Sequence, residues 1–519
     1  MSDIIVSRTK SVKKFFITTA IPYVNDAPHI GHGLDFTLAD VLARYHKQQG
    51  EEVFFETGTD EHGTKIFQKA KEKGQEPQEY VDSIVPLWQN FLKRLNIDAT
   101  AFIRTTSPQH EKTAQYVWTQ LKDYIYKGTY EGWYCAGEES FVTPTEAAAN
   151  NGICPLHKKP YEKLSEENYY FKLSAFGNQI KQSLTAGEFK IYPEFRQNEI
   201  LNLVDGEGGL RDLSISRPKS QLTWGIPVPG DDDQVMYVWF EALLNYVSVL
   251  GYPDGEDFKK FWPPDVWVGG KDILRFHAAI FPAMLIALDL PLPKTLLVHG
   301  HILAGGTKMS KTIGNVIAPL QIIDAYGVDA FRYYFLRHIP TIDDGDFTWE
   351  KFENAYNNEL GNELGNLVQR VAAMINRYQE GVIGDLPRPE HDSGPYHDAI
   401  RQLRLDRALD ETWVMIRQLN VYLEEVKPWE LAKKPEEASH LQEVLAYAAG
   451  SLQQIADLLW PFLPTTAATM RHIFEGGTVK PYQGVLFPKI YQHTQDPRTA
   501  PKSAPVAPDA VTKKPKDKK

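Results

Sequence analysis

Hydrophobic and polar positions near the N-terminus predict a strand, a helix and a second strand. Residues 15–19 are apolar and β-branched, which is typical of a short buried strand. Apolar residues then recur at helical spacing and predict one buried helix face, made by Leu34, Leu38, Val41, Leu42 and Tyr45. A second apolar run at 53–55 predicts another strand. Because strand, helix and strand form a βαβ unit, we expect a parallel sheet that binds ligands at the carboxyl ends of its strands.

The rest of the chain changes its pattern several times. Residues 64–125 carry amphipathic patterns and are predicted to be helical, whereas residues 132–161 are rich in Gly, Pro and turn residues, which is typical of an insertion between two halves of a sheet. Apolar runs at 266–270 and 296–299 predict a return to the parallel sheet. From Ala330 onward the chain is predicted to be helical throughout, as a separate bundle with segments at 356–371, 396–426, 429–433, 436–463 and 466–474.

Length, charge and cysteine content narrow the class of protein. The chain has 519 residues, more than one core usually serves, so about two to four domains are expected. A net charge of −11 argues against non-specific coating of nucleic acid, but not against a partner held on a local basic surface. Two cysteines fit a reducing compartment, and residues 1–14 lack an apolar core of signal-peptide length. The most apolar run, 276–288, is shorter than the ~20 residues of a membrane span, so we expect a cytoplasmic protein.

Two histidines begin the predicted helix of the βαβ unit. His29 and His32 are three residues apart, so both project from the first turn on one side. That turn also presents free backbone N–H groups and the positive end of the helix dipole, which favour phosphate. Gly31 leaves room for a ring or a phosphate to approach the backbone. These features predict a nucleotide site, and two hydrogen-bonded histidines at a helix start are the alternative.

Further polar residues follow the predicted strands. Asp60 comes after the second strand, where its carboxylate would hold a substrate ammonium or else cap the next helix. Lys308 and Lys311 come after the strand at 296–299, behind a double glycine, and predict a loop that closes on an anion. A helical stripe that would be either core or binding surface contains Trp239, Ala242 and Tyr246.

The insertion contains half of a zinc-binding pattern. Cys154 and His157 have the spacing of half a zinc knuckle, and Cys135 and Glu138 stand where a second cysteine pair is expected. A lone carboxylate is uncommon in a structural thiolate site. The sequence therefore favours a zinc-free knuckle held by packing over a bound zinc, both interpretations stay open, and no residue is assigned as a metal ligand.

Taken together, these stretches resemble class I aminoacyl-tRNA synthetases. Ala20-Ile21-Pro22-Tyr23 leading to His29-Ile30-Gly31-His32, and Lys308-Met309-Ser310-Lys311-Thr312 far downstream, are similar to the two signature motifs of that class. Thr312 replaces the usual final serine and keeps a hydroxyl. The resemblance covers about residues 14–488; Glu138 departs from it, and the C-terminal tRNA-binding domain of some members is absent. The blocks that resemble methionyl-tRNA synthetases in particular are 58–63, 237–246, 270–277, 298–300, 366–370 and 427–429.

The resemblance implies an α/β fold with a Rossmann-like parallel-sheet catalytic domain, an inserted connective domain and, after them, an all-α anticodon-binding helical bundle. The expected boundaries are 1–125 and 226–300 for the two halves of the catalytic domain, 126–225 for the connective domain with its knuckle, 301–350 for the lysine (KMSKS) loop and stem-contact region, 351–493 for the bundle, and 494–519 for a disordered basic tail.

The resemblance also implies a reaction and its residues. Methionine and ATP, with Mg²⁺, would give methionyl adenylate, and the methionyl group would pass to the terminal adenosine of tRNA(Met), including the initiator. The residues implied for ATP binding and catalysis are His29, Gly31, His32, Lys308 and Lys311. Those implied for methionine binding are Ile21, Tyr23, Asp60, Arg217, Trp239, Ala242, Tyr246, Asp272, Ile273 and His277. Those implied for anticodon binding are Asn366, Arg370, Pro428 and Trp429. Because the C-terminal appendage is absent, we expect a monomer.

The sequence disfavours several alternatives to this function. Synthetases for isoleucine, valine, leucine or cysteine should not show this pocket and anticodon set, and those with editing domains carry much longer insertions. Small nucleotidyltransferases share the His-x-Gly-His turn, but not this length or a helical half. A catalytically silent tRNA-binding paralogue is disfavoured because His29, His32, Lys308 and Lys311 are all present. An apolar pocket rejects a substrate that lacks one methylene by only ~1–3 kcal/mol, so some activation of homocysteine, and some editing, is expected.

Overall fold

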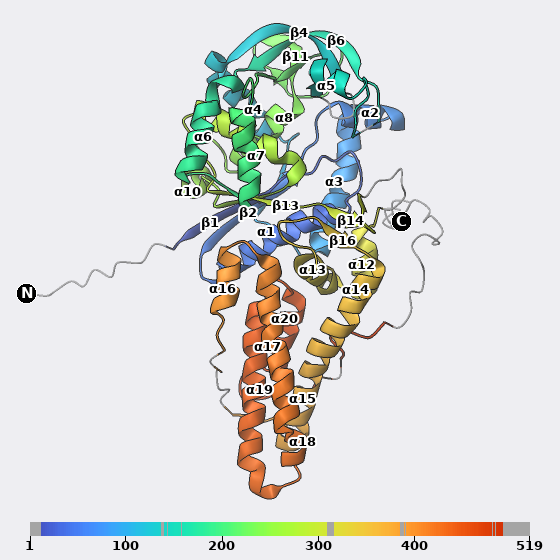
Figure 1. The fold of residues 1–519 in the computed structure, drawn as a ribbon, viewed down its shortest axis with the longest axis vertical. Coiled ribbons are helices and arrows are strands. Elements are labelled where there is room, and N and C mark those ends of the chain that lie inside the picture. Colours follow the sequence, from blue (N-terminus) through green and yellow to red (C-terminus); the bar gives the residue numbers. More distant parts are fainter. Residues whose placement is uncertain are drawn as a thin grey trace, which may run out of the picture.

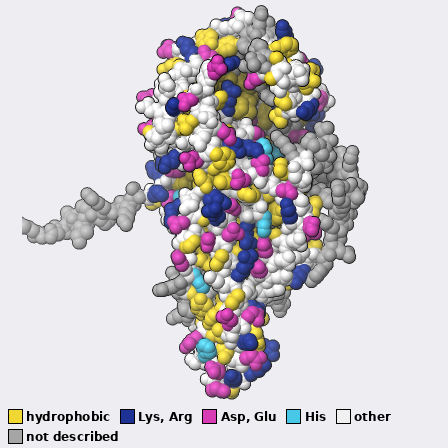
Figure 2. Space-filling view, viewed as in Figure 1, with side chains coloured by type: hydrophobic (Ala, Val, Ile, Leu, Met, Phe, Trp, Pro, Cys, Tyr) yellow, Lys and Arg dark blue, Asp and Glu magenta, His cyan; other side chains and the backbone are white. Residues whose placement is uncertain are grey.

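The computed structural model describes residues 12–135, 140–142, 144–156, 158–308, 316–384, 389, 391–479, 481–482 and 484–490. The predicted basic tail at 494–519 lies outside these residues. Within the described part of the chain, no helix combines the length and the apolar character needed to cross a membrane. On the face shown in Figure 2, Lys and Arg side chains are interspersed with Asp and Glu.

A six-stranded parallel sheet forms the centre of the molecule, as the sequence predicts (Figure 1). All neighbouring strands are parallel. Side chains alternate between its two faces, so that Ile17 and Val268 join one hydrophobic core and Trp267 and Val298 join another. In order across the sheet the strands are β3 (Ala101–Arg104), β2 (Glu52–Thr59), β1 (Lys14–Thr19), β12 (Val266–Gly270), β13 (Thr295–His299) and β7 (Lys190–Tyr192).

Helices cover both faces of this sheet. Helix α1 (Ile30–Gln48) connects β1 to β2 and buries the apolar face predicted from its periodicity. Residues 64–125 are not helical throughout, because β3 lies among them and pairs with β2, so that prediction is wrong at 101–104. The other helical elements of this part are α2 (Thr64–Lys73), α3 (Pro77–Arg94), α4 (Pro108–Gln120), η1 (Lys122–Tyr124), η2 (Leu173–Phe176), α6 (Gly177–Ala186), α7 (Glu194–Asp205), α8 (Val238–Ala242), α9 (Asn245–Ser248), α10 (Glu256–Phe261), η3 (Lys271–Ile273), η4 (Phe276–Ile280) and α11 (Phe281–Ala287).

Antiparallel strands form a cap at the end of the molecule opposite the bundle (Figure 1). A four-stranded sheet has the order β5 (Ser140–Val142), β4 (Ile125–Cys135), β6 (Glu162–Phe171) and β8 (Leu213–Ser214), with α5 (Pro144–Ala149) beside it. A three-stranded sheet has the order β10 (Pro227–Val228), β11 (Asp231–Met236) and β9 (Ser216–Pro218). The segment predicted as one insertion, 126–225, also contains β7, which pairs with β13 in the central sheet.

A junction leads from the central sheet into the helical bundle. It contains β14 (Ile302–Ala304), β15 (Thr307–Lys308), α12 (Pro319–Tyr326), α13 (Val328–Arg337), β16 (Gly345–Phe347) and α14 (Trp349–Ala355). Because β16 pairs with β14, the chain is not helical throughout from Ala330, and that prediction is wrong at 345–347. The predicted bundle is confirmed, with η5 (Tyr356–Gly365), α15 (Asn366–Gln379), α16 (Gly394–Arg401), α17 (Leu405–Val426), α18 (Pro428–Leu431), η6 (Pro435–Glu437), α19 (Ala438–Leu459) and α20 (Pro464–Ile473).

A buried ion pair ties α1 to the bundle. Arg332, on α13, donates to the carboxylate of Asp40 in α1 at 2.7 Å. The same guanidinium donates to the carbonyl oxygens of Phe462 (2.6 Å) and Pro461 (2.9 Å), which follow α19. Arg332 and Asp40 are both completely buried. Since breaking such a pair leaves an uncompensated buried charge, these bonds hold α1 firmly against the bundle.

Candidate active site

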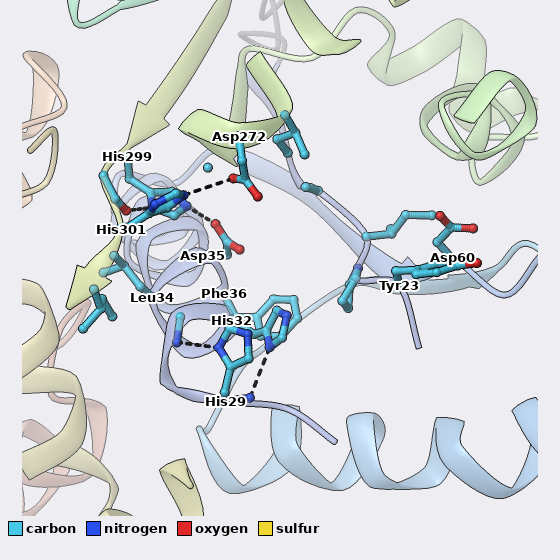
Figure 3. A pocket seen from close by; sticks show the side chains of 18 of the residues that line it. Tyr23, His29, His32, Leu34, Asp35, Phe36, Asp60, Asp272, His299 and His301 are labelled. Carbon is cyan, nitrogen blue, oxygen red and sulfur yellow. Dashed lines mark hydrogen bonds and ion pairs between the residues drawn. The ribbon is translucent and has the colours of Figure 1, made fainter. Parts of the chain in front are cut away.

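A cavity of about 460 Å³ opens at the carboxyl edge of the parallel sheet (Figure 3). The cavity lies next to β1, which has β2 on one side and β12 on the other. Open α/β sheets bind ligands where the order of the strands reverses in this way. The lining of the cavity comes from the ends of β12 and β13, from the segments that follow β1, β2, β12 and β13, and from the first two turns of α1, with Trp239 of α8 and Val316. The lining residues are Ala20, Ile21, Pro22, Tyr23, Ala27, His29, Gly31, His32, Leu34, Asp35, Phe36, Asp60, Trp239, Gly270, Asp272, Ile273, His299, Gly300, His301, Ile302 and Val316.

The two predicted histidines form a reciprocal cap at the start of α1. Nδ1 of His29 accepts a hydrogen bond from the backbone N–H of Gly31 (3.1 Å), and Nδ1 of His32 accepts one from the backbone N–H of His29 (3.2 Å). Burial lowers the pKa of both imidazoles, and that of His32 lies well below its ordinary value. Neutral rings that accept at Nδ1 carry their proton on Nε2. The rings stack with centroids 3.8 Å apart, and both residues line the cavity.

Gly31 lines the cavity, and its lack of a side chain makes room for the His29 ring. A Cβ atom at Gly31 would lie 2.9 Å from Cε1 of His29. The space that the sequence assigned to an approaching ring or phosphate is therefore filled by the His29 imidazole. The ring of His32 packs against Trp88 of α3 in a T-shaped arrangement with centroids 4.7 Å apart, and this contact supports the His32 ring. His29 and His32 therefore fit both interpretations, because they form hydrogen bonds at the helix start and also line the cavity.

Asp60 lies on the opposite wall of the cavity, beside Tyr23 (Figure 3). Its backbone N–H donates to the carbonyl oxygen of Pro22 (2.9 Å), and its own carbonyl accepts from Val24 (3.1 Å). These bonds fasten the loop after β2 to the segment after β1. The N-cap position of α2 is Gly63, so the alternative interpretation of Asp60 as a helix cap is wrong. The Asp60 side chain is 6% exposed and lines the cavity.

The other residues predicted for the amino acid fall into a lining set and a supporting set. Trp239 lines the cavity and stacks on Phe276 with centroids 3.7 Å apart. Ile21 and Ile273 line it as well, as does Asp272. Ala242, Tyr246 and His277 are buried and are not among the lining residues. Trp239 and Ala242 lie on α8 but Tyr246 lies on α9, so the single helical stripe predicted for them is wrong.

Tyr246 and His277 support the cavity from behind. The Tyr246 hydroxyl donates to Nε2 of His277 (2.8 Å), and Nδ1–H of His277 donates to the carbonyl of Ile273 (3.1 Å). Burial lowers the pKa of His277 to about 4, so the ring is neutral at pH 7, as this pattern requires. His277 lies in the π-helical turn η4, a local distortion that often occurs at functional sites. The chain of bonds fixes Ile273, which does line the cavity.

Arg217 does not reach the cavity. Its guanidinium donates to Oγ of Ser214 (2.9 Å) and to the carbonyl of Ser216 (2.7 Å). The same group lies over the ring of Tyr237, 4.4 Å from its centroid. These contacts place Arg217 within the antiparallel cap, at β9, and it is not among the lining residues.

Three polar residues in the cavity were not singled out as site residues from the sequence. Asp35 forms an ion pair with Nε2 of His299, whose Nδ1–H donates to the carbonyl of Gly300 (2.8 Å). Burial alone would lower the pKa of His299, but the Asp35 carboxylate outweighs it and raises that pKa. His301 lies with Nε2 3.5 Å from Asp272. The available signals were the position of His299 at the end of the predicted strand at 296–299, the position of His301 two residues later, and the position of Asp35 in the predicted helix that follows His32.

The double glycine before the lysine motif forms a tight hairpin. Gly305 and Gly306 have φ angles of 61° and 75°, which suit a two-residue hairpin turn between β14 and β15. The backbone of Lys308 pairs with Leu303. The Lys308 side chain and Lys311 lie outside the described residues. On either side of the motif, Ile302 and Val316 line the cavity.

Two of the predicted anticodon residues share a second hollow, of about 760 Å³, in the bundle. Asn366 is exposed there, and Arg370 donates to Oδ1 of Asn420 (3.1 Å) and pairs with Glu424. Pro428 opens α18, as predicted. Trp429 is half-buried against the bundle core and is not among the residues that line this hollow.

The predicted knuckle is only partly described. Cys135 and Cys154 are buried together with Val142, Ala147 and Tyr161 in a small core of their own. Glu138 and His157 lie outside the described residues. Among the described residues, no group of three or more His, Cys, Asp and Glu side chains is placed to hold a metal ion. Bound zinc and a packed, zinc-free knuckle stay open as interpretations.

Comparison with known proteins agrees with this geometry. The sequence model of the family described as tRNA synthetases class I (M) matches residues 15–162 and 147–372. Methionine–tRNA ligase of Caldanaerobacter subterraneus subsp. tengcongensis is 43% identical over 476 residues, covering 88% of this chain and 73% of the relative. That of Streptomyces coelicolor is 41% identical over 530 residues, covering 97% and 96%.

A solved structure extends the likeness to three dimensions. Methionyl-tRNA synthetase of Mycobacterium tuberculosis, in complex with methionyl-adenylate, superposes with a TM-score of 0.85 at 32% identity, covering 92% of this chain and 100% of that one. The match includes the central sheet and the helical region, and it confirms the α/β fold class predicted from the sequence. On the strength of this match and of the identity to curated relatives along most of its length, the chain belongs to the class I methionyl-tRNA synthetases.

Proposed function

We propose that this chain activates L-methionine with ATP, releasing pyrophosphate, and transfers the methionyl group from the adenylate to the terminal adenosine of tRNA(Met), including the initiator. The observation that carries the proposal is the arrangement of the cavity. Two neutral imidazoles with Nε2–H donors stand at a helix N-terminus on one wall, and a buried carboxylate beside aromatic side chains stands on the other. One wall suits a triphosphate and the other an amino acid.

The substrate carboxylate is itself the nucleophile, so the chain needs to position and to stabilise charge rather than to supply an attacking group. His29 and His32 donate to phosphate oxygens as negative charge develops, and the backbone at Gly31 adds the field of the helix N-terminus. Lys308 and Lys311 deliver positive charge to the α-phosphate and the leaving pyrophosphate, and Lys311 carries the larger share in the transition state. Loss of one such donor typically costs ~3 kcal/mol in activation free energy.

Magnesium enters this proposal with the nucleotide. Because the described residues hold no ready-made group of metal ligands, a Mg²⁺ ion would be held by the phosphates of ATP, where it neutralises part of their charge. The chain's own residues then complete the neutralisation. The pairs Asp35–His299 and Asp272–His301 stand beside the His29–His32 pair and lie on the nucleotide side of the cavity.

Methionine occupies the other wall. Asp60 receives its ammonium group, and Ile21, Tyr23, Trp239 and Ile273 surround its thioether. Aromatic rings and sulfur attract each other by ~0.3–1.5 kcal/mol per contact. Ala242, Tyr246 and His277 set the depth of the pocket from behind, and Arg217 acts from the cap rather than in the cavity.

Recognition of tRNA belongs to the bundle. Asn366 and Arg370 share one hollow and offer amide and guanidinium donors to unstacked anticodon bases. Pro428 sets the start of α18, and Trp429 next to it supplies a surface on which a base can stack. The chain is proposed to act as a monomer in the cytoplasm.

Amino-acid-dependent exchange of pyrophosphate into ATP tests the proposal. Across all the amino acids, exchange should be fastest with methionine and detectable with homocysteine, which the pocket rejects by only ~1–3 kcal/mol. Absence of exchange with every amino acid, together with retained tRNA binding, would establish the alternative of a silent tRNA-binding paralogue. If methionine supports exchange but homocysteine does not, the expectation of homocysteine activation and editing fails.

A further inference from the structure

The loop that carries Asp60 is held by the two residues that follow it. The carboxylate of Glu61 accepts hydrogen bonds from the Thr59 hydroxyl (2.6 Å) and from the Arg104 guanidinium (2.8 Å). Nδ1–H of His62 donates to Oε1 of Glu241 at 3.0 Å. Neither Glu61 nor His62 lines the cavity. Asp60, Glu61 and His62 thus point to different partners, and of the three only Asp60 lines the cavity.

Glu241 is the centre of the second anchor. It is completely buried on α8, and its two oxygens serve two different histidines. Oε1 accepts from His62 on the β2 loop, and Oε2 accepts from Nε2–H of His110 on α4 at 2.8 Å. Nδ1 of His110 in turn contacts the hydroxyl of Ser248 on α9 at 2.9 Å. One carboxylate thus cross-links the β2 loop to α4 and α8, and through His110 to α9.

This cross-link lies between the two parts of the amino-acid wall. Asp60 is two residues from His62, and Trp239 is two residues from Glu241. At Gly63, where φ is 101°, a Cβ atom would lie 2.6 Å from the Tyr23 hydroxyl and 3.3 Å from Cβ of Val238, so the loop, Tyr23 and α8 are in close contact. Movement of α8 relative to the β2 loop would change the distance between the Asp60 carboxylate and the Trp239 ring.

The chemistry of the cross-link also points beyond packing. A buried carboxylate with two imidazoles is expensive to desolvate, and apolar side chains of similar volume generally stabilise a core at least as well. Burial alone would lower the pKa of His62, but the Glu241 carboxylate, with smaller contributions from Glu111 and Glu61, raises it. Directional bonds from one residue to two elements fix a geometry that apolar contacts leave adjustable.

We propose that Glu241 is a positioning residue for amino-acid recognition: by accepting from His62 and His110 at once, it sets the separation of the Asp60 carboxylate and the Trp239 ring. The inference rests on the proposed function of the cavity, in which those two groups contact the ammonium and the side chain of methionine. Glu241 itself touches neither substrate. Its effect should therefore appear in the binding of the amino acid and not in that of ATP.

The test replaces Glu241 by Gln in the full chain, which keeps the shape but leaves one side-chain position unable to accept. In pyrophosphate exchange, Glu241→Gln should raise KM for methionine about tenfold or more, since small displacements of binding groups have large effects, while KM for ATP changes by less than about twofold. The dissociation constant of 4-(methylthio)butyrate, which lacks the amino group, should change much less than that of methionine. Glu111→Gln is the matched control, because it removes a negative charge near His62 without removing a hydrogen bond to it.

Two further variants keep the result decisive. If Glu241→Gln does not fold, His110→Phe, which removes the second donor, carries the same expectations. Equal rises in KM for methionine and ATP, or no rise in either, would overturn the positioning role. Asp60→Asn separates the two proposals: if it raises KM for methionine while Glu241→Gln and His110→Phe do not, only the positioning role fails. If Asp60→Asn leaves KM for methionine unchanged, the proposed amino-acid site fails and the positioning role fails with it.

Discussion

Glu56 offers the sharpest physical test of the central sheet. It lies within β2, is completely buried, and pairs in register with Thr18 of β1. The Thr18 hydroxyl contacts both the carbonyl of Thr19 (3.2 Å) and the Glu56 carboxyl, yet it has one proton to donate. A protonated Glu56 resolves this, because its own O–H then donates to Thr18 while Thr18 donates to Thr19. Oε1 of Glu56 has no hydrogen-bond partner among the described residues, which also favours the neutral acid.

The expected effect on stability follows from the pKa of this group. Burial raises the pKa of Glu56 from 4.5 to about 8. Between these values the folded chain holds a proton that the unfolded chain has lost, so stability is greatest at low pH and falls as pH rises toward about 8. At about 1.4 kcal/mol per pH unit, the loss is about 3 kcal/mol by pH 7 and about 5 kcal/mol above pH 8.

The perturbation is Glu56→Gln, which keeps the size of the side chain and removes the titration. Urea unfolding of both proteins between about pH 5 and pH 9 should give free energies of unfolding that diverge, with the parent chain losing about 4 kcal/mol relative to the variant. Glu52→Gln, at an exposed position of the same strand, is the control and should give no such divergence. Parallel curves for the parent chain and Glu56→Gln would refute a neutral, buried Glu56. A difference infrared spectrum at pH 7 should show the band of a protonated carboxyl that the variant lacks.

Three further predictions concern the sites. Gly31→Ala pushes the His29 ring out of its cap, so pyrophosphate exchange should fall about a hundredfold; a fall of less than about threefold would contradict this role of the glycine. Tyr246→Phe leaves Nε2 of His277 without its donor, so the free energy of unfolding should fall by about 1–3 kcal/mol and KM for methionine should rise, with KM for ATP unchanged; equal changes in both constants would argue against a pocket role. Trp429→Ala should raise KM for tRNA with exchange intact, whereas equal losses in both assays would identify a core tryptophan.

The parts of the fold and site that the sequence predicts correctly are those set by local features, such as where a helix starts or a strand ends. His29, Gly31 and His32 lie at a helix start because an apolar helical pattern begins immediately after them. Asp60 and Ile273 lie at the cavity because each follows a strand of a parallel sheet, and such strands present their carboxyl ends at one edge. Pro428 opens a helix because its fixed φ suits that position.

The parts that sequence reasoning missed depend on contacts between distant segments. Strand β3 has four residues, too few to show a period, and it becomes a strand by pairing with β2. Strand β16 likewise depends on β14. His299 and Asp35 are 264 residues apart and form a pair only in the folded chain. Tyr246 and His277 likewise form a pair only in the folded chain. His277 lies in a π-helical turn, which hydrophobic periodicity does not predict.

Helix α1 links the two halves of the proposed reaction. Its first turn presents His29 and His32 to the cavity, and Asp40 in its interior bonds both to Arg44 of the same helix (2.7 Å) and to Arg332 of the junction. Because Arg332 also holds the carbonyl groups that follow α19, a shift of the bundle against the sheet would have to break buried, charged hydrogen bonds or move α1 with it. Movement of α1 would displace the Nε2–H donors from the proposed phosphate positions, where errors of about 1 Å would cost about a hundredfold in rate. The position of the bundle and the geometry of the nucleotide site are therefore set by the same few bonds, and neither can vary independently of the other.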